Sequence, residues 1–342
     1  MAIEFDFNRK FTREVLQEFS DILQDMQHQI SFKVSSRGWC YLMEQAGYIN
    51  KSQFSKVDMA INRCRKEGYL PVDFVAEEDA RAFQGVIKPS DGEVSDTLNW
   101  MLKNVLDGSH YFKPDYWEDE EYYIQVVVEK IDLKTLFAPV CEKYKIPIAN
   151  AKGWSSILQR AEYARRFKEA EDAGLKCVLL YCGDHDPDGL RISDTLRKNL
   201  RDISDIEWAD GTVGYDPVNL QIERFGLNYD FIKKNNYTWI DNLITGSGMN
   251  LASKSHKNNR LPYVQDYLNT IGERKCEANA IVTTPTVAKA LMQGEIERWL
   301  GSDSLSRFKA KERAVEVEYQ RVLKETGLME PIQKFLGREE DE

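Results

Sequence analysis

The middle of the chain alternates between short apolar runs and stretches with helical periodicity. Apolar residues dominate 122–128, where several are β-branched, and fill 178–182, which is typical of buried strands. Helical spacing of apolar residues follows from Leu133 to Tyr144, and a second helix is predicted over 157–170. A short strand at 146–149 is predicted between these two helices. This strand–helix–strand–helix–strand order predicts an α/β fold, a parallel sheet with crossover helices.

The N-terminal part has a different pattern. Amphipathic helices are predicted over 11–30 and 34–46, and a third runs from Lys51 to about Lys66. A strand is predicted over 69–75. Helices followed by a strand and a polar loop indicate an α+β winged helix-turn-helix, a DNA-binding arrangement.

The remaining segments are shorter or more polar. Helices are predicted over 94–106, 190–200, 221–227 and 311–327, and a glycine-rich loop is predicted over 245–250. The loop has no lysine in the P-loop pattern, so it does not indicate a nucleotide-binding site. The last five residues, 338–342, read as a frayed acidic tail.

Three acids follow the apolar run at 178–182. Asp184 and Asp186 alternate along an extended segment, so both side chains can point at one spot, and Asp188 precedes a glycine. Glu129 follows the other run, and parallel strands would bring it to the same edge of the sheet. Carboxylates this close repel unless a cation neutralises them, and oxygen ligands suit Mg²⁺ or Mn²⁺. The alternative is an ordinary solvated, acid-rich turn.

Composition narrows the class of protein. The 342 residues are 42% hydrophobic and 30% charged, as in ordinary globular proteins, and they suggest two domains. No membrane span or secretory signal is predicted, and six cysteines without Cys-x-x-Cys spacing favour reduced thiols in a cytoplasmic protein. The net charge of −10 argues against generic polyanion binding, although acids at a metal site do not exclude a DNA enzyme.

Three motifs resemble one known family. They are Val-Glu-Lys at 128–130, Lys-Gly-Trp-Ser-Ser at 152–156 and Asp-His-Asp-Pro-Asp-Gly-Leu at 184–190. Together they resemble the Toprim domain of the topoisomerase VI A subunit family, which includes the meiotic double-strand-break transesterases. The resemblance implies that Glu129, Asp184 and Asp186 bind Mg²⁺ or Mn²⁺, with Glu129 in a catalytic role.

Three further residues fall around this implied site. Asp188 and Lys130 would contact the ligands rather than the metal, or Asp188 would cap the turn before the next helix. Glu277 lies in a segment that resembles a late segment of the family, where it would pack domains together or support the ligands. A solvated acid near a helix start is the alternative for Glu277.

The resemblance also implies a nucleophile. The family has a winged-helix domain whose nucleophilic tyrosine follows an arginine by four residues, and Arg37 and Tyr41 have this spacing. Residues four apart share a helix face, so the guanidinium could stabilise a phenolate and bind the scissile phosphate. The family more often has an aromatic residue where this chain has Cys40. The alternative is a core tyrosine, because Tyr41 lies in an apolar run.

The third N-terminal helix has a local excess of basic residues. These candidates for DNA contact are Lys51, Lys56, Arg63, Arg65 and Lys66, against the acids Asp58 and Glu67. A groove-facing helix would need such an excess, and a solvated helix face would show it as well.

The resulting prediction has four regions and three candidate functions. The regions are a winged-helix domain (1–76), an acidic linker region (77–121), a Toprim domain (122–300) and a C-terminal helix with an acidic tail (301–342). The resemblance implies Mg²⁺-dependent DNA cleavage, by tyrosine transesterification, in a homodimer in which the tyrosine of one subunit meets the metal of the other. Any ATPase would be a separate subunit. The alternatives are a Toprim nuclease that uses water to cut DNA or RNA, and a non-catalytic DNA-binding subunit.

Overall fold

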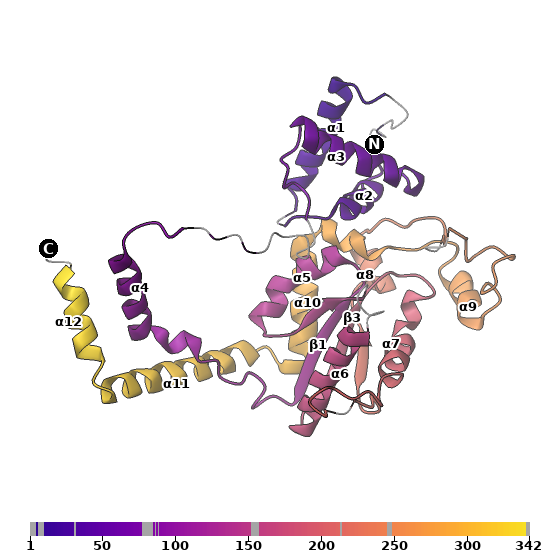
Figure 1. Ribbon diagram of the computed structural model, residues 1–342. Helices are drawn as coiled ribbons and strands as arrows, with labels where there is room; N and C mark the ends of the chain where they lie inside the picture. The colour runs from indigo at the N-terminus through magenta and orange to yellow at the C-terminus, as the bar shows by residue number, and fades with distance from the viewer. Residues whose placement is uncertain are drawn as a thin grey trace. The chain divides into compact units, whose positions relative to one another are not determined.

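The computed structural model (Figure 1) describes residues 5, 10–30, 32–76, 85, 87, 89–151, 157–212, 214–244 and 248–339. The chain forms two compact units: unit 1 is Met1–Glu77 with Glu121–Trp299, and unit 2 is Glu78–Glu120 with Leu300–Glu342. The Lys-Gly-Trp-Ser-Ser turn, the glycine-rich loop at 245–247, the start of the predicted linker and the end of the acidic tail lie outside the described residues.

Four parallel strands form the sheet of unit 1, in the order β2-β1-β3-β4. The strands are β1 (Tyr122–Val128), β2 (Ile148–Asn150), β3 (Lys176–Cys182) and β4 (Gln221–Arg224). Val128 pairs with Cys182, so the carboxyl ends of β1 and β3 lie side by side. The predicted α/β fold with a parallel sheet is therefore confirmed.

Helices cover both faces of this sheet. The crossover helices are α5 (Ile131–Lys143), α6 (Ile157–Asp172) and α7 (Ile192–Arg201), the last preceded by the short η5 (Gly189–Arg191). The chain moves from β1 out to β2 and then back to β3 and β4, so right-handed crossovers put α5 on one face and α6 and α7 on the other (Figure 1). The later elements of unit 1 are α8 (Tyr229–Lys234), α9 (Pro262–Thr270), η6 (Ala278–Thr283) and α10 (Pro285–Leu300).

One prediction for the sheet region was wrong, and a second had the wrong starting residue. The predicted helix at 221–227 is instead β4, whose residues pair with Val178 to Tyr181 of β3. A four-residue segment is too short for its periodicity to distinguish strand from helix, and pairing with a neighbour decided it. The strand predicted at 146–149 begins later, at Ile148, because Pro147 has no N–H to donate.

The N-terminal segment of unit 1 folds into the predicted helices. These are α1 (Arg13–Gln27), α2 (Ser36–Gln45), η1 (Lys51–Gln53) and α3 (Phe54–Glu67). The strand predicted at 69–75 was wrong: the segment consists of turns, with Phe74 N–H donating to the Pro71 carbonyl at 3.0 Å. Its one ladder-like contact is an isolated bridge between Ser35 and Ala76. Phe74 instead stacks on Trp39 at 5.1 Å between ring centroids, so packing rather than pairing holds the segment.

Helix α2 packs closely against α5 at Gly38. Ser35 caps α2, and its N–H donates to Asp132 Oδ1 at 3.2 Å, while the Asp132 side chain is buried. A Cβ on Gly38 would lie 2.5 Å from Val34 Cγ1 and closer still to Asp132 Oδ2. Only a residue without a side chain allows this approach between the N-terminal helices and the α/β sheet.

We expect Gly38→Ala to lower the free energy of unfolding by about 1–3 kcal/mol, because the added methyl group forces α2 away from Asp132. The matched control is Gly294→Ala in α10, where a Cβ would meet no atom within 4 Å. There the better helix former should raise stability by up to about 1 kcal/mol. Thermal melts of both variants check the prediction, and equal melting temperatures would contradict it.

Unit 2 is helical in its described part. It contains α4 (Val94–Leu106), η3 (Gly108–Tyr111), α11 (Ser304–Glu325) and α12 (Met329–Glu339). The helix predicted at 94–106 is confirmed, and the one predicted at 311–327 begins earlier, at Ser304. The described part of the predicted linker thus packs with the C-terminal helices. None of the helices within the described ranges is long and apolar enough to cross a membrane.

Candidate active site

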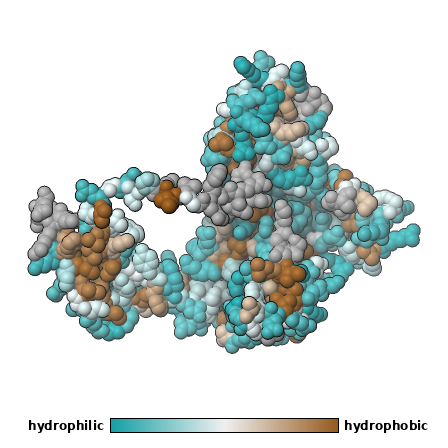
Figure 2. All heavy atoms as spheres, viewed as in Figure 1, coloured by the Kyte–Doolittle hydropathy of each residue, from teal (hydrophilic) through white to brown (hydrophobic). Residues whose placement is uncertain are grey.

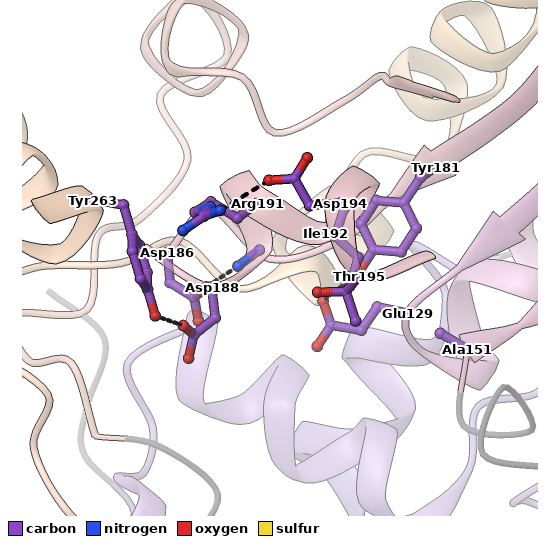
Figure 3. A pocket seen from close by; sticks show the side chains of 11 residues that line it. Glu129, Ala151, Tyr181, Asp186, Asp188, Arg191, Ile192, Asp194, Thr195 and Tyr263 are labelled. Carbon is purple, nitrogen blue, oxygen red and sulfur yellow. Dashed lines mark hydrogen bonds and ion pairs between the residues drawn. The ribbon is translucent and has the colours of Figure 1, made fainter. Parts of the chain in front are cut away.

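A pocket of about 550 Å³ opens at the carboxyl end of the sheet (Figure 3). Its wall includes Glu129, Tyr181, Asp186, Asp188, Arg191 and Tyr263. Ligands of open α/β sheets bind at this end of the strands, where helix and loop segments leave space. Two of the three predicted metal ligands therefore face one cavity.

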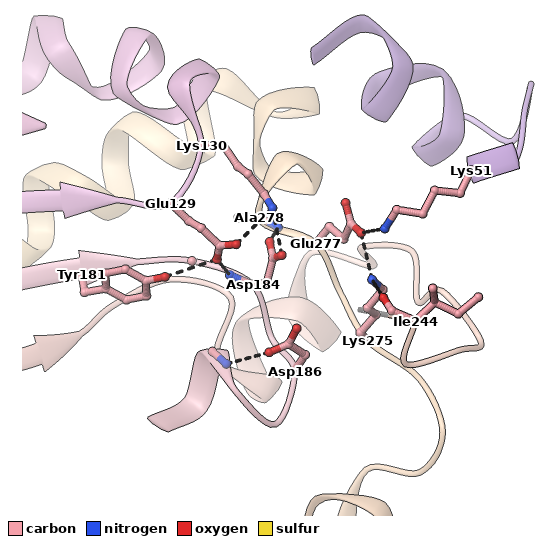
Figure 4. A network of polar contacts seen from close by, with 12 residues as sticks. Lys51, Glu129, Lys130, Tyr181, Asp184, Asp186, Ile244, Lys275, Glu277 and Ala278 are labelled. Atoms are coloured by element: carbon pink, nitrogen blue, oxygen red, sulfur yellow. Dashed lines mark hydrogen bonds and ion pairs between the residues drawn. The ribbon is translucent and has the colours of Figure 1, made fainter. Parts of the chain in front are cut away.

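Glu129 and Asp184 are joined directly. Asp184 N–H donates to Glu129 Oε2 at 2.8 Å, and the hydroxyl of Tyr181 donates to the same oxygen at 3.2 Å (Figure 4). Glu129 N–H in turn donates to the Cys182 carbonyl at 2.9 Å. The paired ends of β1 and β3 thus fix the two carboxylates next to each other, as the sequence predicted for parallel strands.

Lys130 lies between these two carboxylates. Its Nζ is 3.1 Å from Glu129 Oε1 and 3.0 Å from Asp184 Oδ2. Burial disfavours its charge, but the carboxylates of Asp184 and Glu129 prevail and raise the pKa of Lys130. The ammonium group therefore supplies the positive charge that two adjacent carboxylates need.

The three carboxyls differ in their affinity for a proton. Asp184 is 8% exposed, and burial together with Glu129 and Glu277 raises its pKa to about 7, although Lys130 acts against the rise. Burial also raises the pKa of Asp186. For Glu129, burial is outweighed by Lys130, which lowers the pKa. Glu129 thus favours its ionised form, whereas burial favours the protonated forms of Asp184 and Asp186.

Asp186 holds the turn that follows β3. Its Oδ1 accepts a hydrogen bond from Gly189 N–H at 2.6 Å. Asp188 is exposed, makes no capping hydrogen bond with its side chain, and accepts one from the hydroxyl of Tyr263 at 2.8 Å. The predicted capping role of Asp188 was therefore wrong, because Asp186 satisfies the turn.

Several residues that the sequence did not indicate shape this turn. Arg224 at the end of β4 donates from Nη2 to the carbonyls of Gly183 (3.1 Å) and Asp184 (2.8 Å). His185 points inward, donates from Nδ1 to the Leu227 carbonyl at 2.6 Å, and has a pKa lowered to about 4 by burial. Arg224 thus fixes the backbone around Asp184, and the convergence of the Asp184 and Asp186 carboxylates on one spot stays a prediction.

Tyr41 and Arg37 lie on one face of α2, as their spacing predicted. The Arg37 guanidinium carbon is 5.6 Å from the centre of the Tyr41 ring, and Lys130 Nζ is also 5.6 Å from it. Tyr41 is half-buried, whereas its neighbours Cys40 and Leu42 are buried. The phenol thus lies beside the lysine that contacts the carboxylates, and its role as a nucleophile or as a core tyrosine stays a prediction.

An ion-pair cluster joins the N-terminal helices to the sheet region (Figure 4). Glu277 Oε1 is 2.5 Å from Lys51 Nζ and 3.0 Å from Lys275 Nζ, and Glu277 is 2% exposed. Glu277 is thus not the solvated acid of the alternative reading, and it lies where two parts of unit 1 meet. Ala278 N–H, next in the chain, donates to Asp184 Oδ1 at 2.7 Å.

The five basic candidates around the third helix have different surroundings. Lys51 pairs with Glu277, Arg63 pairs with Glu67 at 2.5 Å, and Arg65 donates to the Val72 carbonyl at 2.8 Å. Lys56 is half-buried and Lys66 is exposed. A DNA-binding role for this face would therefore use side chains that also have contacts within the chain.

The carboxylate oxygens of Glu129, Asp184 and Asp186 are the type of ligand that divalent cations prefer. Within the described ranges, no three His, Cys, Asp or Glu side chains are grouped so that they could hold a metal ion as they stand. Glu129, Asp184 and Asp186 offer only oxygen donors, and burial, followed by the neighbouring carboxylates, raises the pKa of Asp184 and Asp186. The donor set is thus of the type that Mg²⁺ or Mn²⁺ prefers, and Lys130 occupies the space between Glu129 and Asp184.

We expect Lys130→Met to lower the free energy of unfolding in chelator by about 3 kcal/mol at pH 8, because it leaves two carboxylates without their cation. The loss should be smaller at pH 6, since a raised folded-state pKa lets Asp184 take up a proton there. Added Mn²⁺ should stabilise the variant more than the wild type. Lys134→Met, one turn further along α5, is the control, and a Lys130 variant that melts like this control at both pH values would contradict the role of Lys130.

Comparison with known proteins gives no relative for this chain. No family model matches it, and neither does any curated protein or solved structure.

Proposed function

We propose that this chain is a Mg²⁺-dependent enzyme that cleaves DNA phosphodiesters, similar in action to the topoisomerase VI A subunit family. One observation carries the proposal: Glu129, Asp184 and Asp186 follow the adjacent strands β1 and β3, and a half-buried tyrosine lies beside Lys130, which contacts Glu129 and Asp184. We also infer that the sheet of unit 1 is a Toprim domain and that α1 to α3 form a winged-helix type of DNA-binding segment.

The carboxylates would hold the cation of this reaction. Glu129, Asp184 and Asp186 are the proposed ligands, and a bound Mg²⁺ would neutralise the scissile phosphate and the leaving oxygen. Tyr181 and Ala278 orient Glu129 and Asp184 through the hydrogen bonds that they donate. Lys130 Nζ also lies 5.6 Å from the centre of the Tyr41 ring, so its positive charge is close to the proposed nucleophile.

Tyr41 is the proposed nucleophile. Its oxygen would form a bond to phosphorus as the bond from phosphorus to the 3′ oxygen breaks, which leaves a 5′-phosphotyrosyl link and a 3′ hydroxyl. The phenolic proton would leave as the bond forms, and the 3′ oxygen would take up a proton. Arg37, beside the ring, would bind the non-bridging phosphate oxygens.

Two other functions have some support in the same site. The pocket beside Glu129 and Asp186 has room for water, which would favour a Toprim nuclease that cuts DNA or RNA without a covalent step. The position of Lys130 between Glu129 and Asp184 would favour a non-catalytic DNA-binding subunit, in which lysine permanently replaces the metal.

Assembly and partners belong to the same proposal. The family resemblance implies a homodimer, and the net charge of −10 suggests that stable DNA binding needs dimerisation or a partner. Any ATP-driven step would require a separate ATPase or accessory subunit.

Labelled DNA incubated with the protein and Mn²⁺, then separated on denaturing gels with and without protease, distinguishes the three functions. We expect labelled ends that enter the gel only after protease treatment, since a tyrosyl link keeps them on the protein. Free ends without protease would indicate hydrolysis by water. Uncut DNA under all conditions would contradict cleavage and favour the binding subunit.

A further inference from the structure

The loop before α9 carries positive charges and no negative ones. Residues 251–260, called the basic loop, contain Lys254, Lys257 and Arg260 and no acid. The absence of Asp and Glu extends over residues 242–265, although these acids make up 56 of the 342 residues of the chain. The basic loop is thus a local concentration of positive charge in a chain whose net charge is −10.

The three cations of the basic loop have no partner within the part of the chain that the structure describes. All three side chains are exposed, and they form no ion pair or hydrogen bond with the described residues. Lys51 and Arg63 of the N-terminal helices, by contrast, pair with carboxylates of the chain. The basic loop and α9 project from the α/β part of unit 1 (Figure 1), and the outer part of this projection is mainly hydrophilic (Figure 2). The charge of the loop is therefore available to an external anion.

Contacts inside the chain hold the basic loop in place, although it consists of turns. The buried Asn259 side chain donates from Nδ2 to the carbonyls of Leu251 (3.0 Å) and Ala252 (3.1 Å). Gln265 Nε2 donates to the Asn259 carbonyl at 2.6 Å. Leu251 also packs in a small core with Leu243, Val264 and Tyr267. A loop that is fixed before binding loses little conformational entropy when a ligand arrives.

The basic loop leads into the wall of the pocket at the carboxyl end of the sheet. Helix α9 begins at Pro262, two residues after Arg260, and Tyr263 in its first turn lines the pocket. The hydroxyl of Tyr263 donates to Asp188 at 2.8 Å, and the Arg191 guanidinium carbon is 4.8 Å from the centre of the Tyr263 ring (Figure 3). A polymer that leaves the pocket past Tyr263 therefore reaches the basic loop next.

We propose that the basic loop binds the phosphate backbone of duplex DNA on one side of the cleavage site. Lysine and arginine side chains contact phosphates without reading bases, so the contact does not depend on sequence. A DNA duplex extends beyond the scissile phosphate in both directions and can occupy the pocket and the loop together, whereas a small anion fits only one of them. The inference rests on the DNA cleavage proposed for the pocket, and it adds the surface that holds the substrate beside the cut.

Fluorescence anisotropy of a labelled DNA duplex measures this contact, and a chelator in the buffer prevents metal-dependent cleavage during the measurement. The test variant combines Lys254→Gln, Lys257→Gln and Arg260→Gln. We expect about 30-fold weaker binding at about 100 mM salt, on the order of threefold for each cation. The slope of log affinity against log salt concentration should fall in magnitude by about 2–3, because each lost phosphate contact removes about 0.9. Duplexes of different sequence should lose affinity equally.

A second triple variant removes the same charges elsewhere in unit 1. It combines Lys143→Gln, Lys198→Gln and Arg201→Gln, whose side chains are exposed in the last turns of α5 and α7. These helix ends lie away from the pocket, because α5 follows Lys130 directly and α7 begins at Ile192 in the pocket wall. This control should bind DNA within about threefold of the wild type, and thermal melts should show that both variants are folded.

Equal affinities of the two triple variants for DNA would overturn the role of the basic loop and leave the proposed cleavage intact. Weaker binding by the first variant alone, in a protein that never cuts DNA with Mn²⁺, would support the loop and contradict only the cleavage. Polyglutamate that displaces the duplex from the wild type as well as unlabelled DNA does would overturn the proposal and assign the loop to an acidic protein. A wild type that binds no duplex, with or without Mn²⁺, would overturn both.

Discussion

Replacing Asp184 by asparagine is expected to reduce Mn²⁺-dependent DNA cleavage roughly 1,000-fold or more. The metal stabilises developing charge by several kcal/mol, and each 1.36 kcal/mol corresponds to a factor of ten in rate. The amide oxygen of asparagine can still accept the hydrogen bond from Ala278 N–H, so the local fold should persist. The removed charge is the one that faces Lys130 and the proposed metal position.

Asp188→Asn is the matched control for this change. The chemical change is the same, from aspartate to asparagine, and the site is four residues further along the turn. The Asp188 side chain is exposed and accepts a hydrogen bond from Tyr263. Substitutions of exposed side chains change the free energy of unfolding by only about 0.5 kcal/mol. A change of that size in the activation free energy corresponds to about a threefold change in rate, so cleavage should stay within about threefold of the wild type. If the Asp184 and Asp188 variants cleave equally well, the proposed metal ligands are wrong.

Replacing Tyr41 by phenylalanine is expected to abolish protein-linked DNA ends, again by roughly 1,000-fold or more, because no hydroxyl remains to attack phosphorus. The ring that packs edge-on against Phe54 at 5.1 Å and lies near Arg37 is retained, so the fold should not change. Denaturing gels before and after protease treatment measure the linked fraction directly.

Tyr48→Phe, three residues after the end of α2, is the control and should keep full activity. Cleavage that persists in Tyr41→Phe as free ends would rule out the tyrosine mechanism and favour hydrolysis by water. A mixture of Tyr41→Phe and Asp184→Asn proteins adds a test of assembly. Recovered cleavage in the mixture would mean that the tyrosine of one subunit acts at the metal of the other.

The strands of the sheet were predictable where the sequence is strongly apolar. The runs that became β1 and β3 are buried along almost their whole length, and such runs are distinctive. The segment Gln221–Arg224 is only partly buried at the sheet edge, so its pattern did not distinguish it from a helix. The segment 69–75 has strand-like residues but pairs with no strand among the described residues, and Pro71 removes a donor from any ladder.

The candidate site was predictable only as far as parallel strands dictate it. The proximity of Glu129 and Asp184 follows from the paired ends of β1 and β3. The positions of Lys130 and Tyr41 depend on how side chains and separate helices pack, which no local pattern encodes. The contribution of Arg224 was missed because its segment was expected to be a helix.

Mn²⁺ titration of the wild type and an Asp184→Asn, Asp186→Asn double variant, followed by electron paramagnetic resonance, tests the central claim most directly. We predict that the wild type removes Mn²⁺ from the free pool at one or two sites, and that the double variant loses this binding while it remains folded. Equal binding by the two proteins would contradict the claim that these carboxylates form a metal site, as would a wild type that binds no Mn²⁺.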